Sequence, residues 1–217
     1  MELESVLPTG YGDAKYICEL MLDATLHRHP DRFEAMVVRP GQIAGSSASG
    51  YWNPMEHLSF LVKSSQTLRA LPDLTGPLSW TPVDTVAGTL GDLLFTPQPY
   101  AVYHIDNPIR QPWEATLRVL ATALDIENNT IPLDEWVQRV KDHARAQERG
   151  REHEGDNPAI LLVDFLEDNF VRMSCGGLLL DTARAREHSK TLTACGPVSE
   201  KLVRLFVNSW RKMGFLR

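Results

Sequence analysis

The chain has 217 residues and carries 22 Lys and Arg against 28 Asp and Glu, which gives a formal charge of −6. Its 43% apolar and 23% charged residues are close to the averages of globular domains, which excludes a disordered, collagen-like or coiled-coil chain. The acidic balance argues against non-specific nucleic-acid binding, because such binding needs a basic surface. No apolar run approaches the roughly 20 residues of a membrane span, and the first residues lack the pattern of a signal peptide.

The first half of the chain alternates helical and extended patterns. Apolar residues near helical spacing predict a helix over residues 11–29, which ends before Pro30. The short apolar run 33–38 contains Val37 and Val38 and predicts a buried strand, which Pro40 and Gly41 end. The following patterns predict a glycine- and serine-rich loop at 45–50, a helix at 55–68, a strand at 78–83, a helix at 86–94 and a strand at 101–105.

The second half of the chain is predicted to be almost entirely helical. Helical patterns occupy residues 113–124, 133–148, 158–170, 181–189 and 199–213. We therefore expect an α/β fold, in which the last units of a Rossmann-like parallel sheet precede a mainly helical subdomain. The predicted division places the sheet remnant at 1–50 and the mainly helical subdomain at 51–217.

Tyr11 and Lys15 form the first pattern that could carry chemistry. Residues four apart on a helix share a face, and an ammonium beside a phenol eases transfer of the phenolic proton. Carbonyl reduction requires such a donor, because the oxygen must be protonated as hydride arrives. On spacing alone, an ordinary solvated helix face is the favoured interpretation of this pair.

Other candidates have simpler structural explanations. The joint at 36–45 would expose backbone at the carboxyl edge of a parallel sheet, where ligands bind in open α/β folds, but a plain turn also fits. Asp84 or Thr85 is interpreted as an N-cap of the following helix. Cys175, before two glycines, fits a turn better than a nucleophile. The three cysteines and seven histidines lack metal-ligand spacing, so we predict no metal site and reduced thiols in a cytoplasmic protein.

Taken in order, several motifs resemble the second half of an extended short-chain dehydrogenase/reductase. More specifically, they resemble the terminal thioester reductase domains of polyketide synthases, nonribosomal peptide synthetases and carboxylic acid reductases. This resemblance covers about residues 8–137. The tail after residue 157 is most similar to the reductive-release domain of fungal non-reducing polyketide synthases. The motifs are YGDAK at 11–15, VVRPGQIAGS at 37–46, GYWNP at 50–54, LPDLTGPLSWTPVD at 71–84 and VYHIDNP at 102–108.

This resemblance implies an NADPH-dependent enzyme that reduces a thioester on the phosphopantetheine arm of an acyl carrier protein. A hemithioacetal would collapse to an aldehyde, which some relatives reduce further to an alcohol. By resemblance Tyr11 is the proton donor, and Lys15 holds the nicotinamide ribose. The other implied residues are Pro40, Gly41 and Ile43 along the nicotinamide and Gln42, Trp52 and Met55 toward the substrate.

The sequence departs from the family in its first part. No G-x-x-G-x-x-G cofactor loop occurs, and no serine or threonine lies well upstream of Tyr11. We therefore expect the chain to be inactive alone, to require the upstream half of the same domain, and to self-associate through the uncovered edge of the strand at 33–38. Two alternatives stay open: a non-redox module that binds a carrier or acyl group, and a reductase-like domain that releases its product by condensation. Intact Tyr11 and Lys15 favour reduction over condensation.

Overall fold

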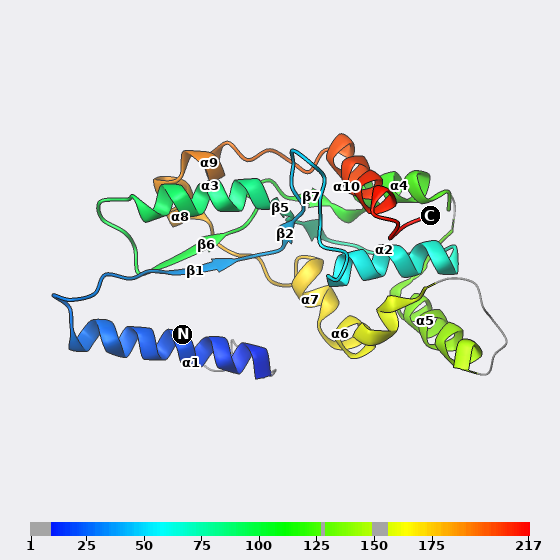
Figure 1. The fold of residues 1–217 in the computed structure, drawn as a ribbon, viewed down its shortest axis with the longest axis horizontal. Helices are drawn as coiled ribbons and strands as arrows, with labels where there is room; N and C mark the ends of the chain where they lie inside the picture. The colour runs from blue at the N-terminus through cyan, green and yellow to red at the C-terminus, as the bar shows by residue number, and fades with distance from the viewer. Residues whose placement is uncertain (1–9, 127–128, 149–155) are drawn as a thin grey trace.

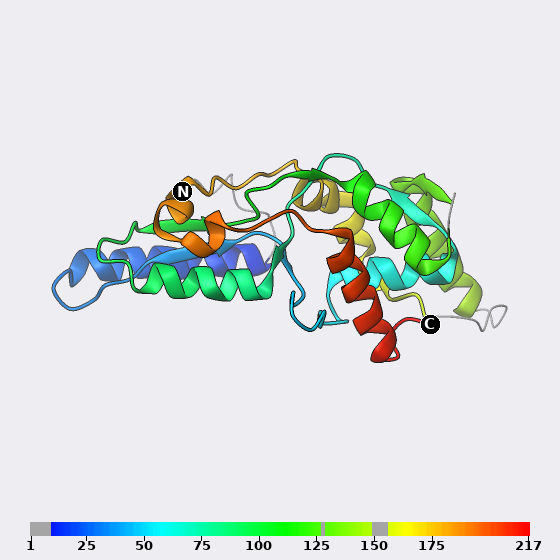
Figure 2. The same ribbon diagram turned by 90° about the horizontal axis from the view of Figure 1, so that it is seen from above.

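The computed structural model describes residues 10–126, 129–148 and 156–217, and its elements form two groups along the long axis of the molecule (Figure 1). The same two groups are separate in the perpendicular view (Figure 2). One group contains α1 (Gly10–Arg28), β1 (Val37–Pro40), α3 (Val83–Leu94), β6 (Val102–Ile105), α8 (Ala183–His188) and α9 (Lys190–Thr193). The other contains α2 (His57–Leu68), α4 (Trp113–Leu124), α5 (Leu133–Glu148), η2 (Pro158–Leu162), α6 (Val163–Asp168), α7 (Phe170–Ser174) and α10 (Glu200–Lys212).

The strands of the described residues pair in four short ladders, and three of these are parallel. β1 pairs with β6 from Val37 opposite Val102 to Pro40 opposite Ile105. The expected α/β fold with parallel pairing is therefore confirmed. The remaining ladders join β2 (Ile43–Ala44) to β5 (Thr81–Pro82), β3 (Leu71–Asp73) to β8 (Thr130–Pro132), and β4 (Pro77–Leu78) antiparallel to β7 (Gln111–Pro112).

Several predicted boundaries were wrong. The strand expected at 33–38 starts at Val37, where the ladder to β6 begins, and extends to Pro40. The helix expected at 158–170 is a 3₁₀ turn followed by two short helices, which Asn169 separates with a non-helical backbone. The helix expected at 181–189 ends at His188, because Ser189 is extended and caps α9 through its hydroxyl.

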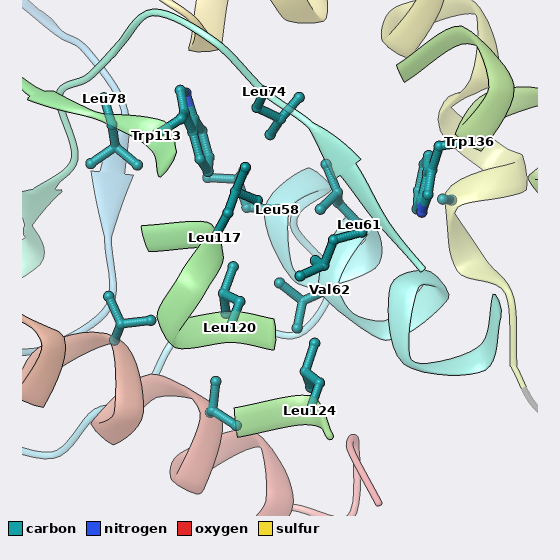
Figure 3. Close-up of a cluster of buried hydrophobic side chains, with 14 of the residues drawn as sticks. Leu58, Leu61, Val62, Leu74, Leu78, Trp113, Leu117, Leu120, Leu124 and Trp136 are labelled. Atoms are coloured by element: carbon teal, nitrogen blue, oxygen red, sulfur yellow. The ribbon is translucent and has the colours of Figure 1, made fainter. Parts of the chain in front are cut away.

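The main hydrophobic core fills the second group. Buried side chains of α2 face those of α4, and each fully buried apolar side chain contributes about 1.5–3 kcal/mol to folding (Figure 3). The indole N–H groups of Trp113, Trp136 and Trp210 each donate to a backbone carbonyl, which satisfies the polar atom of a buried ring. The residues labelled in Figure 3 are Leu58, Leu61, Val62, Leu74, Leu78, Trp113, Leu117, Leu120, Leu124 and Trp136.

A smaller second core lies in the first group. It draws on α3, β6, α8 and α9, and residues of the predicted sheet remnant pack against it. The predicted boundary at residue 50 therefore does not coincide with the boundary between the two cores, because the chain crosses between them several times. The buried members are Val86, Leu93, Tyr103, Ile105, Ala185 and Leu192, with Met36, Val38 and Ile43 partly buried beside them.

Helix α1 is attached differently from the other elements. None of its described residues is buried, and Ile17, Leu20 and Met21 are at least half exposed. An ion pair between Glu19 and Arg39 fixes the helix to β1. None of the described helices combines the length and the apolar character needed to cross a membrane.

The turn that follows β6 links the two groups. The buried Asn107 donates through Nδ2 to the carbonyl of Trp80 at 3.0 Å and to that of Gly196 at 3.1 Å. Arg110 donates to the carbonyls of Asn107 and Leu180. Residues 80, 107, 180 and 196 all belong to segments that run between the groups, so this turn holds four crossings together.

Asn107→Ala should destabilise the protein more than any exposed amide substitution. It removes two hydrogen bonds donated from a buried amide and leaves the part-buried Ile109 N–H without its acceptor, at an expected cost of about 2–3 kcal/mol. Urea unfolding followed by tryptophan fluorescence measures the loss. The matched control is Asn208→Ala on the exposed side of α10, and equal midpoints for the two variants would contradict the linking role of Asn107.

Candidate functional site

A cleft of about 220 Å³ lies between the two groups, at the carboxyl ends of β1 and β6. Ligands bind at this edge in open α/β folds. One wall is polar and comes from the ends of the strands, and the other is largely apolar and comes from α2, α6, α7 and the segment that follows α7. The polar wall contains Arg39, Pro40, Gly41, Gln42, Ser79 and Asp106, and the opposite wall contains His57, Phe165, Met173, Ser174, Leu178 and Leu180.

The backbone at Gly41 is held tightly against Asp106. Gly41 donates its N–H to the carbonyl of Ile105 at 2.7 Å, and a Cβ at this position would lie 2.6 Å from Oδ1 of Asp106. The next residue, Gln42, is held by β5, because its carbonyl accepts a hydrogen bond from the Thr81 N–H at 2.9 Å. Only glycine permits this close approach, so the run that ends β1 has a fixed path along the cleft.

Asp106 is a buried carboxylate with one cationic partner. Its Oδ2 accepts a hydrogen bond from Arg110 at 2.8 Å, and its Oδ1 accepts one from the Asn107 N–H. Burial raises the pKa of Asp106, while the charge of Arg110 opposes this shift. The ion pair therefore offsets part of the cost of burying a charge beside the cleft.

His57 begins α2 and lies among aromatic rings. Its ring is 5.3 Å from Phe165 and 6.3 Å from Phe170, both in edge-to-face geometry. Burial lowers the pKa of His57 to about 4, so the imidazole is neutral near pH 7. Its Nε2 is buried and has no hydrogen-bond partner among the described residues.

Tyr11 and Lys15 lie on one face of α1, as their spacing predicts. The Lys15 Nζ is 5.5 Å from the centroid of the Tyr11 ring, and Tyr11 is 75% exposed. The helix runs antiparallel to β1, with Glu19 bound to Arg39 (Figure 1). Tyr11 lies eight residues before Glu19, so it is about 12 Å from Glu19 along the helix axis, in the direction of the carboxyl end of β1. Neither residue lines the cleft, but both lie at the same end of the strand.

The structure brings only some of the predicted cofactor-binding and substrate-binding residues together. Pro40, Gly41 and Gln42 line the cleft side by side. Ile43 packs against the second core instead. Trp52 is 2% exposed and lies in the main core, where its indole N–H donates to Glu56, so its predicted position facing the substrate is corrected. Met55 is 70% exposed and lies outside the cleft lining.

Asp84 is not the N-cap that its position predicted. Helix α3 begins at Val83, and Pro82 occupies the cap position without a side-chain hydrogen bond. The Asp84 carboxylate instead accepts hydrogen bonds from Ser46 and Ser47 in the glycine- and serine-rich loop. Burial raises the pKa of Asp84, but these hydrogen bonds outweigh it and lower the pKa overall. Asp84 therefore ties this loop to α3.

Several residues of the cleft had not been predicted. Asp106 had a usable signal, because a carboxylate directly follows a predicted strand of the parallel sheet. His57, Phe165 and Met173 had none, because they reach the cleft only through packing of α2 and α6 and α7 against the strand ends.

Comparison with known proteins relates the first part of the chain to a family. Residues 1–90 match the NAD-binding family described as male sterility protein. Over its whole length the chain is 68% identical to non-reducing polyketide synthase dbaI of Emericella nidulans and 58% identical to 3-methylorcinaldehyde synthase of Phoma sp. The chain spans about 8% of each of these curated relatives.

Solved structures show the same fold. The terminal R domain from the myxalamid PKS-NRPS pathway aligns with a TM-score of 0.79 at 22% identity, over 97% of this chain and 52% of that domain. A thiolation-reductase di-domain from an archaeal non-ribosomal peptide synthetase aligns with a TM-score of 0.72 at 16% identity, over 100% of this chain and 43% of that one. These comparisons confirm the resemblance: the chain shares its fold with terminal reductase domains and much of its sequence with fungal non-reducing polyketide synthases.

Gly41→Ala should destabilise the fold, because the new methyl group overlaps the Asp106 carboxylate. We expect a loss of about 1–3 kcal/mol, measured by urea unfolding. The matched control is Gly91→Ala in α3, where a Cβ meets no atom within 4 Å and helix propensity predicts a gain of about 0.5–1 kcal/mol. Opposite signs for the two variants are expected, and a stabilising Gly41→Ala would rule out the tight approach to Asp106.

His57→Phe should flatten the dependence of stability on pH. Below about pH 6.5 the unfolded chain binds a proton at His57 that the folded protein does not bind until about pH 4, so stability falls as the pH drops through this window. Denaturant unfolding at several values between pH 7 and pH 4 measures the slope. The control is His29→Phe, which removes an imidazole that is exposed in the folded protein. A slope that His57→Phe leaves unchanged would show that His57 is not buried as described.

Proposed function

We propose that the chain is the portion of a terminal thioester reductase that carries the proton donor and the acyl-facing cleft. In the complete domain, the reaction would release a polyketide acyl chain from its carrier protein as an aldehyde, with NADPH as the reductant. The observation that carries this proposal is the convergence at one sheet edge. The run Pro40–Gln42, the cleft beside it and the end of α1 with Tyr11 and Lys15 all lie toward the carboxyl end of β1.

The comparisons support the release of an aldehyde. One relative, 58% identical over 222 residues, is named 3-methylorcinaldehyde synthase, and its name describes an aldehyde product. The other relative named above is a polyketide synthase, and the solved reductase domains share the fold of this chain.

The residues along Gly41 fit a flat nicotinamide ring. Gly41 has no side chain between the backbone and the cleft, and a Cβ there would collide with Asp106. Pro40 and Gln42 flank this bare backbone on the cleft wall. When bound, NADPH supplies the hydride that attacks the thioester carbonyl carbon.

The chain's own residues then control the proton and the acyl group. Tyr11 donates its phenolic proton to the carbonyl oxygen as negative charge develops there. The Lys15 ammonium, which faces the Tyr11 ring, stabilises the phenolate that remains and contacts the ribose. Phe165, Met173 and Leu178 hold the acyl chain and exclude water from the thioester. Collapse of the hemithioacetal breaks the C–S bond, which leaves the aldehyde and the carrier thiol.

We also propose the narrower properties that the motifs imply. The 217 residues contain no glycine-rich cofactor loop, so we expect no turnover and no micromolar NADPH affinity from this chain alone. The outer edge of β1 is expected to pair with another chain when this portion is isolated. The three free cysteines, Cys18, Cys175 and Cys195, fit a reducing, cytoplasmic setting.

Tyr11→Phe in the synthase reductase domain that contains this chain should lower kcat by about 10²–10⁴, because the proton donor is lost while the helix is unchanged. NADPH oxidation and aldehyde formation from an acyl thioester measure the loss. The control is Tyr16→Phe on the same helix, which should keep full activity.

Three results would each reject this function. Full activity of Tyr11→Phe would exclude the tyrosine as donor. Product formed at the same rate without NADPH would identify release by condensation. Tight binding of carrier protein with no NADPH oxidation by the complete domain would identify a non-redox binding module.

A further inference from the structure

Positive charge is concentrated at the end of the chain. Residues 183–217 carry eight Lys and Arg against two Asp and Glu, whereas the whole chain has a formal charge of −6. The preceding 182 residues are therefore strongly acidic. Such segregation creates a field that attracts an acidic partner to one region and repels it from the rest of the surface.

Helix α10 places much of this charge on one face. Its inner side contributes Val203, Phe206, Val207 and Trp210 to the main core. At 100° per residue, its exposed Lys201, Arg204, Asn208 and Lys212 fall within an arc of about 80° on the opposite side. We call these four residues the α10 outer face.

The cations of this face have no partners within the protein. Among the described residues, Lys201, Arg204 and Lys212 make no hydrogen bond or ion pair, whereas the neighbouring Arg211 is bound to the carbonyls of Arg217 and Ala123. On the adjacent helix α4, Glu114 is already paired with Arg118. The three cations are therefore available to carboxylates of another molecule.

The inner side of α10 is connected to the cleft lining through the main core. The inner ring of Phe206 is 5.0 Å from Trp52, and Trp52 is 5.0 Å from Trp80. The residue before Trp80 is Ser79, which lines the cleft. Trp52 and Trp80 thus lie between the inner side of α10 and a residue that lines the cleft.

We propose that the α10 outer face docks an acidic surface of the acyl carrier protein that delivers the thioester. This inference rests on the proposed function and adds the place of docking. Opposite charges at the rim of an interface raise the association rate and oppose incorrect partners. The acidic remainder of the chain repels the same carrier, so encounters are directed toward α10.

The test uses Lys201→Glu/Arg204→Glu in the reductase domain that contains this chain, with the same acyl group on two thiols. One substrate is the thioester on the carrier protein, and the other is its N-acetylcysteamine thioester, which has no protein surface. The double variant should lose at least tenfold in kcat/KM with the carrier substrate and keep its rate with the small thioester. Added salt should slow the wild-type reaction with the carrier and leave the variant unaffected.

The matched control is Arg139→Glu/Arg145→Glu on α5, which makes the same charge change at exposed cations elsewhere. It should behave as the wild type with both substrates. Equal kcat/KM values for the two double variants with the carrier substrate would overturn docking at α10.

A binding measurement separates this inference from the proposed function. Titration of labelled carrier protein by fluorescence anisotropy reports docking without turnover. If neither thioester is reduced, the proposed function fails, and the carrier's affinity for wild type and double variant still decides the docking site. A double variant that binds the carrier normally but changes the sedimentation mass of the domain would assign the α10 outer face to a second copy of the chain and reject the carrier.

Discussion

Asn107 and Arg110 donate hydrogen bonds to carbonyl groups on segments that pass between the two hydrophobic cores. A short buried turn after β6 thereby fixes the distance between a small α/β unit and a larger helical one. Each core buries the apolar side chains of its own group of elements, but neither core alone places the strand ends opposite α6 and α7. The cleft exists because this turn joins them, and its Asp106 also defines the path of the chain at Gly41.

Burial of His57 and Asp106 determines how polar the two walls of the cleft are. Loss of solvent moves the pKa of His57 down and that of Asp106 up, so each group is driven toward its neutral form. Arg110 keeps a compensating charge beside Asp106, while His57 packs against the rings of Phe165 and Phe170. The helical wall is therefore a weakly polar surface, suited to an acyl chain and to the exclusion of water. The strand wall retains the hydrogen-bonding groups.

Local patterns in the sequence were enough to locate most of the fold. The valine pair at 37–38, the alternation near Tyr103 and the amphipathic spacing of α2, α4 and α10 predicted elements close to those observed. The short strands at 71–73, 111–112 and 130–132 were missed because each contains a proline, which cannot donate to a ladder and usually marks a chain break. Trp52 and Asp84 were misjudged for a different reason. Their partners, Phe206 and Ser47, lie far away in sequence, and no local pattern encodes such contacts.

Helix α10 shows how one element serves two independent demands. Its inner face is required by the core, where Trp210 stacks on Trp52 and donates to the Trp52 carbonyl. Its outer face is not required by the fold, because exposed and unpaired lysines and arginines contribute little to stability, and clustered like charges slightly oppose it. Solubility does not explain them either, since the chain already carries a net charge of −6 and added cations bring it nearer to zero. Among the described residues these cations have no partner, and the proposed docking of an acidic carrier protein accounts for their sign.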